Sequence, residues 1–171
     1  MAGRARLTLV LGGARSGKSR RAEALVAELP PPWTYIATAE AFDAEMAERI
    51  TRHRDRRDAR WTTLDAPRAL PSVLAEAPSA APVLVDCLTL WLSNLMLAEH
   101  DLEPEWAALE GALARRAAPT VLVSNEVGWG IVPQTPLGRR FRDAQGLLNQ
   151  RMAAAAERVE LVAAGLPLRL K

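Results

Sequence analysis

One short segment near the N-terminus restricts the fold of this chain more than any other. An apolar run at residues 7–11 leads directly into GGARSGKS, which precedes a segment with helical spacing of apolar residues. The pattern G-x-x-x-x-G-K-S between a strand and a helix is a P-loop, whose backbone N–H groups and helix N-terminus bind phosphate. In this interpretation Lys18 neutralises the outer phosphates of a nucleoside triphosphate, and the Ser19 hydroxyl binds the accompanying Mg2+. The predicted nucleotide-binding residues are Gly12, Gly13, Ala14, Arg15, Ser16, Gly17, Lys18 and Ser19.

Composition narrows the class of protein. The 171 residues fit a single domain, 1–171, and 49% hydrophobic with 25% charged residues is ordinary for a globular protein. The net charge of +2 argues against a nucleic acid or a membrane surface as partner. Cys87 is the only cysteine, so no disulfide within the chain is expected. No apolar run is long enough to span a membrane, and the first residues lack a signal-peptide pattern, which predicts a cytoplasmic protein.

Apolar strands and helical segments alternate along the chain. Strands are expected at residues 7–11, 33–37, 61–64, 83–85, 120–124, 159–163 and 166–170. Helices are expected after the P-loop and at 42–58, 67–74, 88–97, 104–117 and 137–157, with a loop at 127–136. The alternation predicts an α/β fold, in which helices flank a mainly parallel sheet that ends in an antiparallel C-terminal strand pair around Gly165.

Polar residues follow several of the expected strands. In a parallel sheet the carboxyl ends of the strands meet at one edge, so Thr38, Asp86 and Glu126 should lie beside the P-loop. Asp86 is the favoured carboxylate for Mg2+, and the alternative is an acid that only caps the next helix. Glu126 is a candidate second group on the metal side or a base for an acceptor hydroxyl, and the alternative is a tight turn over 125–128.

His53 stands among arginines, including Arg54, Arg56 and Arg57. Guanidinium groups disfavour protonation of the imidazole, keep it neutral and nucleophilic, and bind polyphosphate. Asp55 acts on the pKa of His53 in the opposite direction. From the residues alone, a solvated side chain without a chemical role is the more ordinary interpretation.

The remaining histidine and two of the five tryptophans also allow expectations. His100 is expected on the surface of a loop. Trp91 is expected in the core, because it lies in an apolar helical segment. Trp129, between Gly128 and Gly130, is a candidate wall of a site for a large flat or apolar substrate.

Taken together, the motifs resemble one family. The chain resembles the bifunctional adenosylcobinamide kinase / adenosylcobinamide-phosphate guanylyltransferases of cobalamin biosynthesis, and the resemblance extends over nearly its whole length. It is carried by GGARSGKS at 12–19, YIAT at 35–38, EMAERI at 45–50 before His53 and Asp55, NEVG at 125–128, GIVP at 130–133, FRD at 141–143 and NQ at 149–150.

The resemblance implies two reactions on one substrate. The aminopropanol hydroxyl of adenosylcobinamide is phosphorylated from ATP or GTP, and GTP then donates GMP through a guanylyl-histidine, which matches His53. It also implies Mg2+ as cofactor, a fold similar to RecA-type P-loop proteins, and a homotrimer with sites formed between subunits. The guanine nucleotide would contact Ala37, Thr38, Ala39, Arg54, Asp55, Arg56, Arg57, Asp65 and Asp86.

Some positions depart from the family pattern. After the histidine the family tends to have Lys-Asp-Gly-Arg-Pro, whereas this chain has RDRRD at 54–58. Asp65 and Asp86 stand where glutamates are common, which shifts any contact by about one methylene. Two rival functions stay open: a simple P-loop small-molecule kinase in which His53 is idle, and a non-catalytic regulatory protein that associates with a partner according to its nucleotide.

Overall fold

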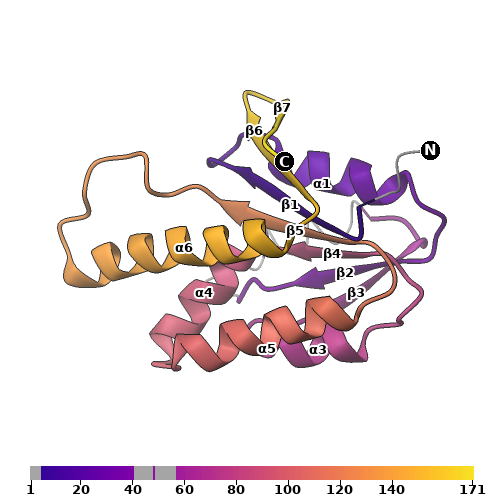
Figure 1. Ribbon diagram of the computed structural model, residues 1–171, viewed down its shortest axis with the longest axis horizontal. Helices are drawn as coiled ribbons and strands as arrows, with labels where there is room; N and C mark the ends of the chain where they lie inside the picture. Colours follow the sequence, from indigo (N-terminus) through magenta and orange to yellow (C-terminus); the bar gives the residue numbers. More distant parts are fainter. Residues whose placement is uncertain (1–4, 41–47, 49–56) are drawn as a thin grey trace.

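The computed structural model describes residues 5–40, 48 and 57–171, and these form an α/β structure around one seven-stranded sheet (Figure 1). The strand order is β3-β2-β4-β5-β1-β6-β7. All neighbouring pairs are parallel except β6 and β7, which are antiparallel. The strands are β1 (Leu7–Gly12), β2 (Trp33–Ala37), β3 (Trp61–Asp65), β4 (Val83–Asp86), β5 (Thr120–Asn125), β6 (Arg158–Ala163) and β7 (Leu166–Arg169). The expected mainly parallel sheet with an antiparallel C-terminal pair is confirmed.

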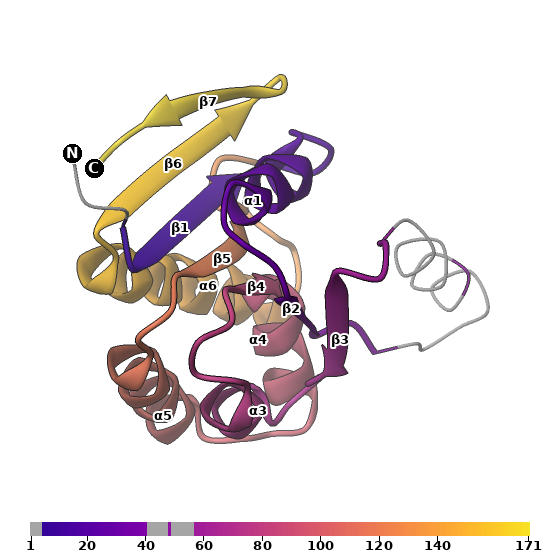
Figure 2. The ribbon, with the colours of Figure 1, turned by 90° about the vertical axis from the view of Figure 1, so that its right-hand side faces the viewer.

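Helices cover both faces of the sheet. Figure 2 shows α1 on one face and α3, α4, α5 and α6 on the opposite face. The described helices are α1 (Lys18–Ala27), α3 (Leu70–Glu76), α4 (Leu88–Leu97), α5 (Leu102–Arg115) and α6 (Pro136–Ala155). The expected helix at 42–58 lies almost entirely outside the described residues. None of the helices in the described parts of the chain is both long and apolar enough to cross a membrane.

Three helices begin one to three residues from their predicted starts. α5 begins at Leu102 rather than at 104, because the Asp101 carboxylate accepts a hydrogen bond from Glu103 N. α6 is capped by Thr135, and α3 begins at Leu70 rather than at 67. Pro136 and Pro71 each lie in a first helical turn, where a missing N–H costs nothing.

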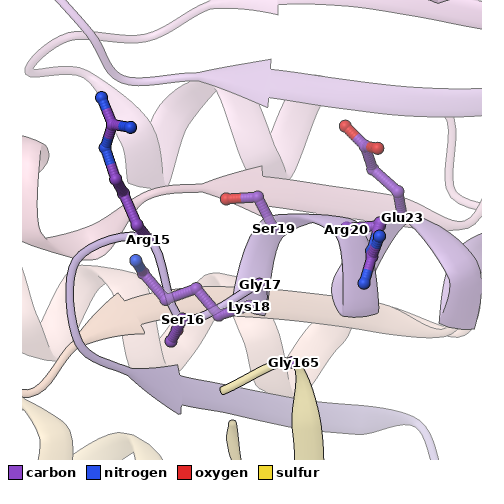
Figure 3. A pocket seen from close by; sticks show the side chains of 8 residues that line it. All are labelled: Arg15, Ser16, Gly17, Lys18, Ser19, Arg20, Glu23 and Gly165. Atoms are coloured by element: carbon purple, nitrogen blue, oxygen red, sulfur yellow. The ribbon is translucent and has the colours of Figure 1, made fainter. Parts of the chain in front are cut away.

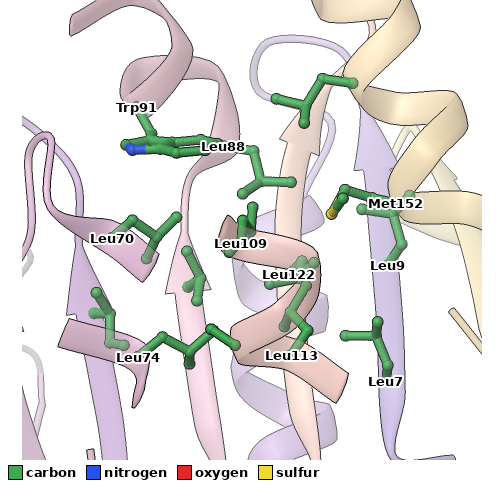
Figure 4. Close-up of a cluster of buried hydrophobic side chains, with 14 of the residues drawn as sticks. Leu7, Leu9, Leu70, Leu74, Leu88, Trp91, Leu109, Leu113, Leu122 and Met152 are labelled. Carbon is green, nitrogen blue, oxygen red and sulfur yellow. The ribbon is translucent and has the colours of Figure 1, made fainter. Parts of the chain in front are cut away.

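Two apolar clusters fill the space between sheet and helices. The larger joins the strands to α3, α4, α5 and α6, and Figure 4 shows Leu9 and Leu122 of the sheet facing Leu109 and Met152 of the helices. Trp91 is fully buried in this cluster, as expected. The smaller cluster packs α1 against the opposite face, so alternate residues of β1 serve the two clusters. This arrangement fixes α1, and with it the P-loop, on a rigid support.

The parallel register brings the ends of the central strands to one edge. Gly12 at the end of β1 pairs with Asn125 at the end of β5, and Ala37 at the end of β2 pairs with both Asp86 and Asp65. The prediction that the P-loop, Thr38, Asp86 and Glu126 share an edge is therefore confirmed. Residues 127–135 form the expected loop before α6.

Candidate active site

The P-loop connects β1 to α1 in a conformation that requires glycine at two positions (Figure 3). A Cβ on Gly12 would collide with Ser16 Oγ and would lie 2.7 Å from the backbone oxygen of Val162. Gly17, the N-cap of α1, has φ 95°, which side chains disfavour. These two constraints account for the glycines that frame the motif.

A pocket of about 590 Å³ opens at this loop. Its size is within the range of small-molecule sites. The lining is polar and carries more positive than negative side chains, as an anion site requires. It consists of Arg15, Ser16, Gly17, Lys18, Ser19, Arg20, Glu23 and Gly165. The residues of the predicted phosphate cradle thus lie together, at the N-terminus of α1.

Two side chains of the loop are poised for a ligand. Lys18 Nζ donates a hydrogen bond of 3.1 Å to the Gly13 carbonyl and therefore folds back over the loop. Ser16 Oγ is buried and has no hydrogen-bond partner in the described part of the chain. A buried hydroxyl without a partner is costly, and a phosphate oxygen at the loop would supply one.

The turn between β6 and β7 supports the P-loop from outside the motif. Gly165 N donates a hydrogen bond of 2.8 Å to the Ser16 carbonyl. Ala164 and Gly165, with φ values of 52° and 80°, form the turn. A second link holds α1 to β6, because Arg21 donates two hydrogen bonds, of 2.8 and 3.1 Å, to the buried Glu160. Burial favours the neutral form of Glu160, but the hydrogen bonds from Arg21 and Arg158 outweigh it and lower its pKa.

Asp86 lies at the end of β4, two strands from β1. Its Oδ2 accepts a hydrogen bond of 3.0 Å from the Tyr35 hydroxyl, and burial followed by the charge of Asp86 raises the pKa of Tyr35. The alternative that Asp86 only caps α4 is wrong, because Cys87 is the N-cap and no side chain caps that helix. Tyr35 orients the carboxylate instead.

The chemistry of Ser19 and Asp86 suits Mg2+, which prefers hard oxygen donors. In nucleotide sites this ion takes one or two carboxylates and completes its shell with phosphates and water. In the described part of the chain no three metal-ligating side chains of His, Cys, Asp or Glu gather at one point. The residues present therefore fit an ion that arrives with the nucleotide, rather than one held by protein ligands alone.

Thr38 and Asn94 hold the end of β2 against the beginning of α4. The Thr38 hydroxyl accepts a hydrogen bond from Cys87 N and donates one of 2.6 Å to the Cys87 carbonyl. Asn94 Nδ2 donates bonds of 2.8 Å to the carbonyls of Thr38 and Pro67. Burial raises the pKa of the Cys87 thiol to about 11, so this thiol is protonated at neutral pH. The hydroxyl and the carbonyl of Thr38 thus form hydrogen bonds within the protein. The predicted contact of Thr38 with the nucleotide stays a prediction.

Glu126 follows β5 directly and lies beside the P-loop strand. Its N–H donates a hydrogen bond of 3.1 Å to the Gly12 carbonyl. Asn149, on α6, contacts both Asn125 and the Glu126 carboxylate. The sequence analysis did not identify Tyr35, Asn94 or Asn149 as supports of the site.

The other predicted nucleotide contacts lie away from the phosphate pocket. Asp65 is at the end of β3, four strands from β1, which corresponds to about 19 Å at the usual strand spacing. Ala37 is at the end of the neighbouring strand β2. The Arg57 guanidinium stacks on the Tyr35 ring at 3.6 Å, and its buried Nε and Nη1 have no hydrogen-bond partner among the described residues. His53, Arg54, Asp55 and Arg56 lie outside the described residues.

The two remaining expectations concern the surface. His100 lies in the loop before α5 and contacts Glu105, with its side chain 40% exposed, as expected. Trp129 is 77% exposed in the loop after β5. Its role as a wall of a substrate site stays a prediction.

The fold and the loop together define a P-loop enzyme with a RecA-like α/β fold. Its fold is similar to that of the flagellar accessory protein FlaH from Methanocaldococcus jannaschii, with a TM-score of 0.56 and 11% identity over 97% of this chain and 78% of the other. The chain belongs to the cobinamide kinase / cobinamide phosphate guanyltransferase family, whose model matches residues 8–170. The family resemblance seen in the motifs is therefore confirmed.

Two relatives cover nearly the full chain. The bifunctional adenosylcobalamin biosynthesis protein CobP of Pseudomonas aeruginosa is 51% identical over 166 residues, which are 95% of this chain and 96% of the relative. The bifunctional adenosylcobalamin biosynthesis protein CobU of Salmonella typhimurium is 44% identical over 182 aligned positions, covering 96% and 99% of the two chains. The similarity thus includes the P-loop, the strand ends and the C-terminal hairpin.

Proposed function

We propose that this chain phosphorylates the aminopropanol hydroxyl of adenosylcobinamide from ATP or GTP. It then transfers GMP from GTP to the phosphorylated product, giving adenosylcobinamide-GDP and pyrophosphate. The observation that carries the proposal is a complete P-loop pocket in a chain that matches the cobinamide kinase / cobinamide phosphate guanyltransferase family over residues 8–170. Full-length relatives whose names include "bifunctional" favour both activities over a simple kinase.

The P-loop edge supplies the groups that the kinase step needs. Backbone N–H groups of the loop and Lys18 Nζ would bind the β- and γ-phosphates. Ser19 and Asp86 would hold Mg2+, which neutralises developing charge when it is bound. The Tyr35 hydroxyl orients Asp86 for this contact. The acceptor oxygen attacks the γ-phosphorus as the nucleoside diphosphate leaves. Because the protein forms no covalent bond in this step, it acts mainly by positioning the reactants and by stabilising charge.

His53 would carry the guanylyl group in the second reaction. A ring nitrogen of His53 attacks the α-phosphorus of GTP, the bond to the bridging oxygen breaks, and pyrophosphate leaves. A phosphate oxygen of the cobinamide phosphate then attacks the same phosphorus and releases the imidazole. Arg57, four residues further along the chain, stacks on Tyr35 next to Asp86, which supports a site near this edge. Nucleotide contacts from Ala37, Thr38, Ala39, Arg54, Asp55, Arg56, Arg57 and Asp65 belong to the same proposal.

We also propose that the 171 residues work as one domain in a homotrimer. The exposed edge strand β7 supports an assembly, because Leu166, Leu168 and the following Leu170 are 73, 59 and 56% exposed. Light scattering at several concentrations tests the trimer, and a monomer at all of them would contradict it. The cytoplasmic location stays a prediction from the sequence.

The test follows each labelled phosphate separately. With Mg2+ and GTP labelled at the α-phosphate, we expect label on the denatured protein that is labile to acid and stable to base. The His53→Ala variant should take up no label, while His100→Ala, at the exposed second histidine, should behave like the parent. ATP labelled at the γ-phosphate should label adenosylcobinamide.

Each failure has a distinct meaning. Absence of label on the parent protein, with GTP binding demonstrated and cobinamide phosphorylated, would leave the simple-kinase alternative. Absence of both products with nucleotide still bound would leave the regulatory alternative.

A further inference from the structure

We propose that Glu126 is the base of the kinase step and that Asn149 is the residue that positions it. This inference rests on the proposed function and adds to it the group that takes the proton from the acceptor hydroxyl. It is carried by a buried hydrogen-bond network that ends at one carboxylate on the phosphate-binding edge.

The strand order places Glu126 between the two halves of the nucleotide site. β5 lies between β4, which ends at Asp86, and β1, which ends at Gly12. Glu126 is the first residue after β5, and its N–H donates to the Gly12 carbonyl. Asp86 pairs with Val123, so Glu126 lies three residues further toward the ligand edge, about 10 Å at the rise of a strand. An acceptor that approaches the outermost phosphate reaches this edge.

Asn149 fixes the backbone and the carboxylate together. Its Nδ2 donates a hydrogen bond of 3.0 Å to the Asn125 carbonyl and a longer one of 3.4 Å to Glu126 Oε1. Thr89 Oγ1 accepts a bond of 2.8 Å from Asn125 N, so the residue before Glu126 is held on both sides. The second carboxylate oxygen is left to a ligand.

The Asn149 side chain is itself locked in place. Its Oδ1 accepts hydrogen bonds of 2.6 Å from Ser124 Oγ and 2.9 Å from Gln145 Nε2, and Gln145 Nε2 also reaches Ser124 Oγ. Ser124 and Gln145 are fully buried, and Asn149 is 5% exposed. Because the Asn125 carbonyl can only accept a hydrogen bond, Nδ2 must face Asn125 and Glu126, and Oδ1 faces the two donors. A buried polar network of this kind rigidifies the groups it holds.

The charge of Glu126 has no cationic partner in the part of the chain that the structure describes. Among residues 5–40, 48 and 57–171, no arginine, lysine or histidine forms an ion pair with it, and Asn149 is its only side-chain hydrogen-bond partner. An anion beside a phosphate site repels the phosphates unless a metal ion lies between them, and Ser19 and Asp86 already supply the metal side of the proposed site. Acceptance of a proton from the acceptor hydroxyl during the reaction gives this carboxylate a function.

The acceptor hydroxyl oxygen attacks the γ-phosphorus of the nucleotide, and its proton passes to a Glu126 carboxylate oxygen. The bond between the γ-phosphorus and the β–γ bridging oxygen breaks, and the nucleoside diphosphate leaves with that electron pair. The proton then passes from Glu126 to water, which restores the carboxylate.

The experiment compares Glu126→Gln, Asn149→Ala and the double variant in both half reactions. A positioned base contributes about 10²–10⁴-fold to a rate, so Glu126→Gln should lower the kinase kcat about 100-fold and leave the KM for ATP unchanged. Asn149→Ala should lower this kcat about tenfold. If Asn149 acts through Glu126, the double variant should be no slower than Glu126→Gln alone. Gln150→Ala, an exposed amide on the same helix, should match the parent.

Guanylylation by α-labelled GTP separates this inference from the proposed function. Both single variants should form the acid-labile adduct at the parental rate, because that reaction needs no proton from the acceptor hydroxyl. Loss of the adduct together with a raised Mg2+ requirement would overturn the proposal and make Glu126 a metal-side group. A kinase kcat within twofold of the parent in Glu126→Gln would also overturn it. If the parent does not phosphorylate adenosylcobinamide, the proposed function itself has failed. Should Asn149→Ala not fold, Ser124→Ala replaces it in the double-variant comparison, with the same criterion.

Discussion

The P-loop and the tips of β2 and β5 meet at the same edge of the sheet but are held by different kinds of contact. The P-loop takes its shape from a continuous stretch of eight residues, through glycine geometry and backbone hydrogen bonds. The tips of β2 and β5 are held by side-chain amides that come from helices, Asn94 on α4 and Asn149 on α6. The first region depends on what the backbone can adopt, and the second depends on buried hydrogen bonds.

Because the two regions are held differently, substitutions in them should affect activity in different ways. A substitution in the P-loop should affect phosphate binding directly, while a substitution in an amide network should act through the geometry of a neighbouring carboxylate or strand. Three substitutions, ordered by expected effect, test this separation.

Lys18→Ala should give the largest effect and should leave the fold intact. Lys18 is partly exposed and, among the described residues, makes one hydrogen bond, to the Gly13 carbonyl, so its loss costs little stability. Removal of one charged donor from developing negative charge commonly costs 10²–10³-fold, and we expect a fall in kinase kcat/KM of about 10³-fold. The measurement is phosphate transfer from γ-labelled ATP to adenosylcobinamide.

The control for this variant is Lys171→Ala, which removes the only other lysine of the chain. Lys171 donates to the carbonyls of Ala153 and Ala154, far along the chain from the P-loop. Equal loss of activity in the two lysine variants would mean that Lys18 acts through overall charge rather than through the phosphate cradle.

The same contrast explains how much could be predicted from the sequence. The P-loop is a local pattern in which each residue type has a physical reason, so its residues and their grouping were predictable. The ends of β2, β4 and β5 were predictable because apolar runs stop at a polar residue, and helix α4 has the predicted bounds 88–97. Both kinds of signal lie within a few consecutive residues.

The supporting contacts were not predictable in the same way. Gly165 contacts Ser16 from the far end of the chain, and nothing in the local sequence specifies that pairing. Asn94 and Asn149 resemble ordinary polar residues of helices until their partners are known. One signal was present: Gln145 and Asn149 are four residues apart and interrupt the apolar side of α6 beside Leu148 and Met152. Polar residues on a buried helix face need partners, so such a pair predicts a network although not its members.

A matched pair of glycine variants tests the backbone half of the comparison. Gly12→Ala places a Cβ 2.7 Å from the backbone oxygen of Val162, which cannot rotate away, and we expect a loss of about 2–3 kcal/mol in the free energy of unfolding. Gly13→Ala meets no atom within 4 Å and should change it by less than about 0.5 kcal/mol. Urea unfolding measures both, and equal destabilisation of the two would show that close approach is not the reason for Gly12.

Asn94→Ala tests the amide half and should have the smallest of the three effects. The change removes both donors from the carbonyls of Thr38 and Pro67, and a buried acceptor without a partner costs about 1–3 kcal/mol. Some of this is recovered if water enters the space left by the amide, so we expect a loss of about 2 kcal/mol in urea unfolding. Asn94→Asp keeps the shape but turns a donor into a negative charge facing the same carbonyls, and it should be less stable than Asn94→Ala. If Asn94→Asp were instead as stable as the parent, hydrogen bonding by Nδ2 could not be what holds the end of β2. Both regions, the P-loop and the strand tips, would then be held by the shape of their residues, and hydrogen bonding by side-chain amides would not distinguish them.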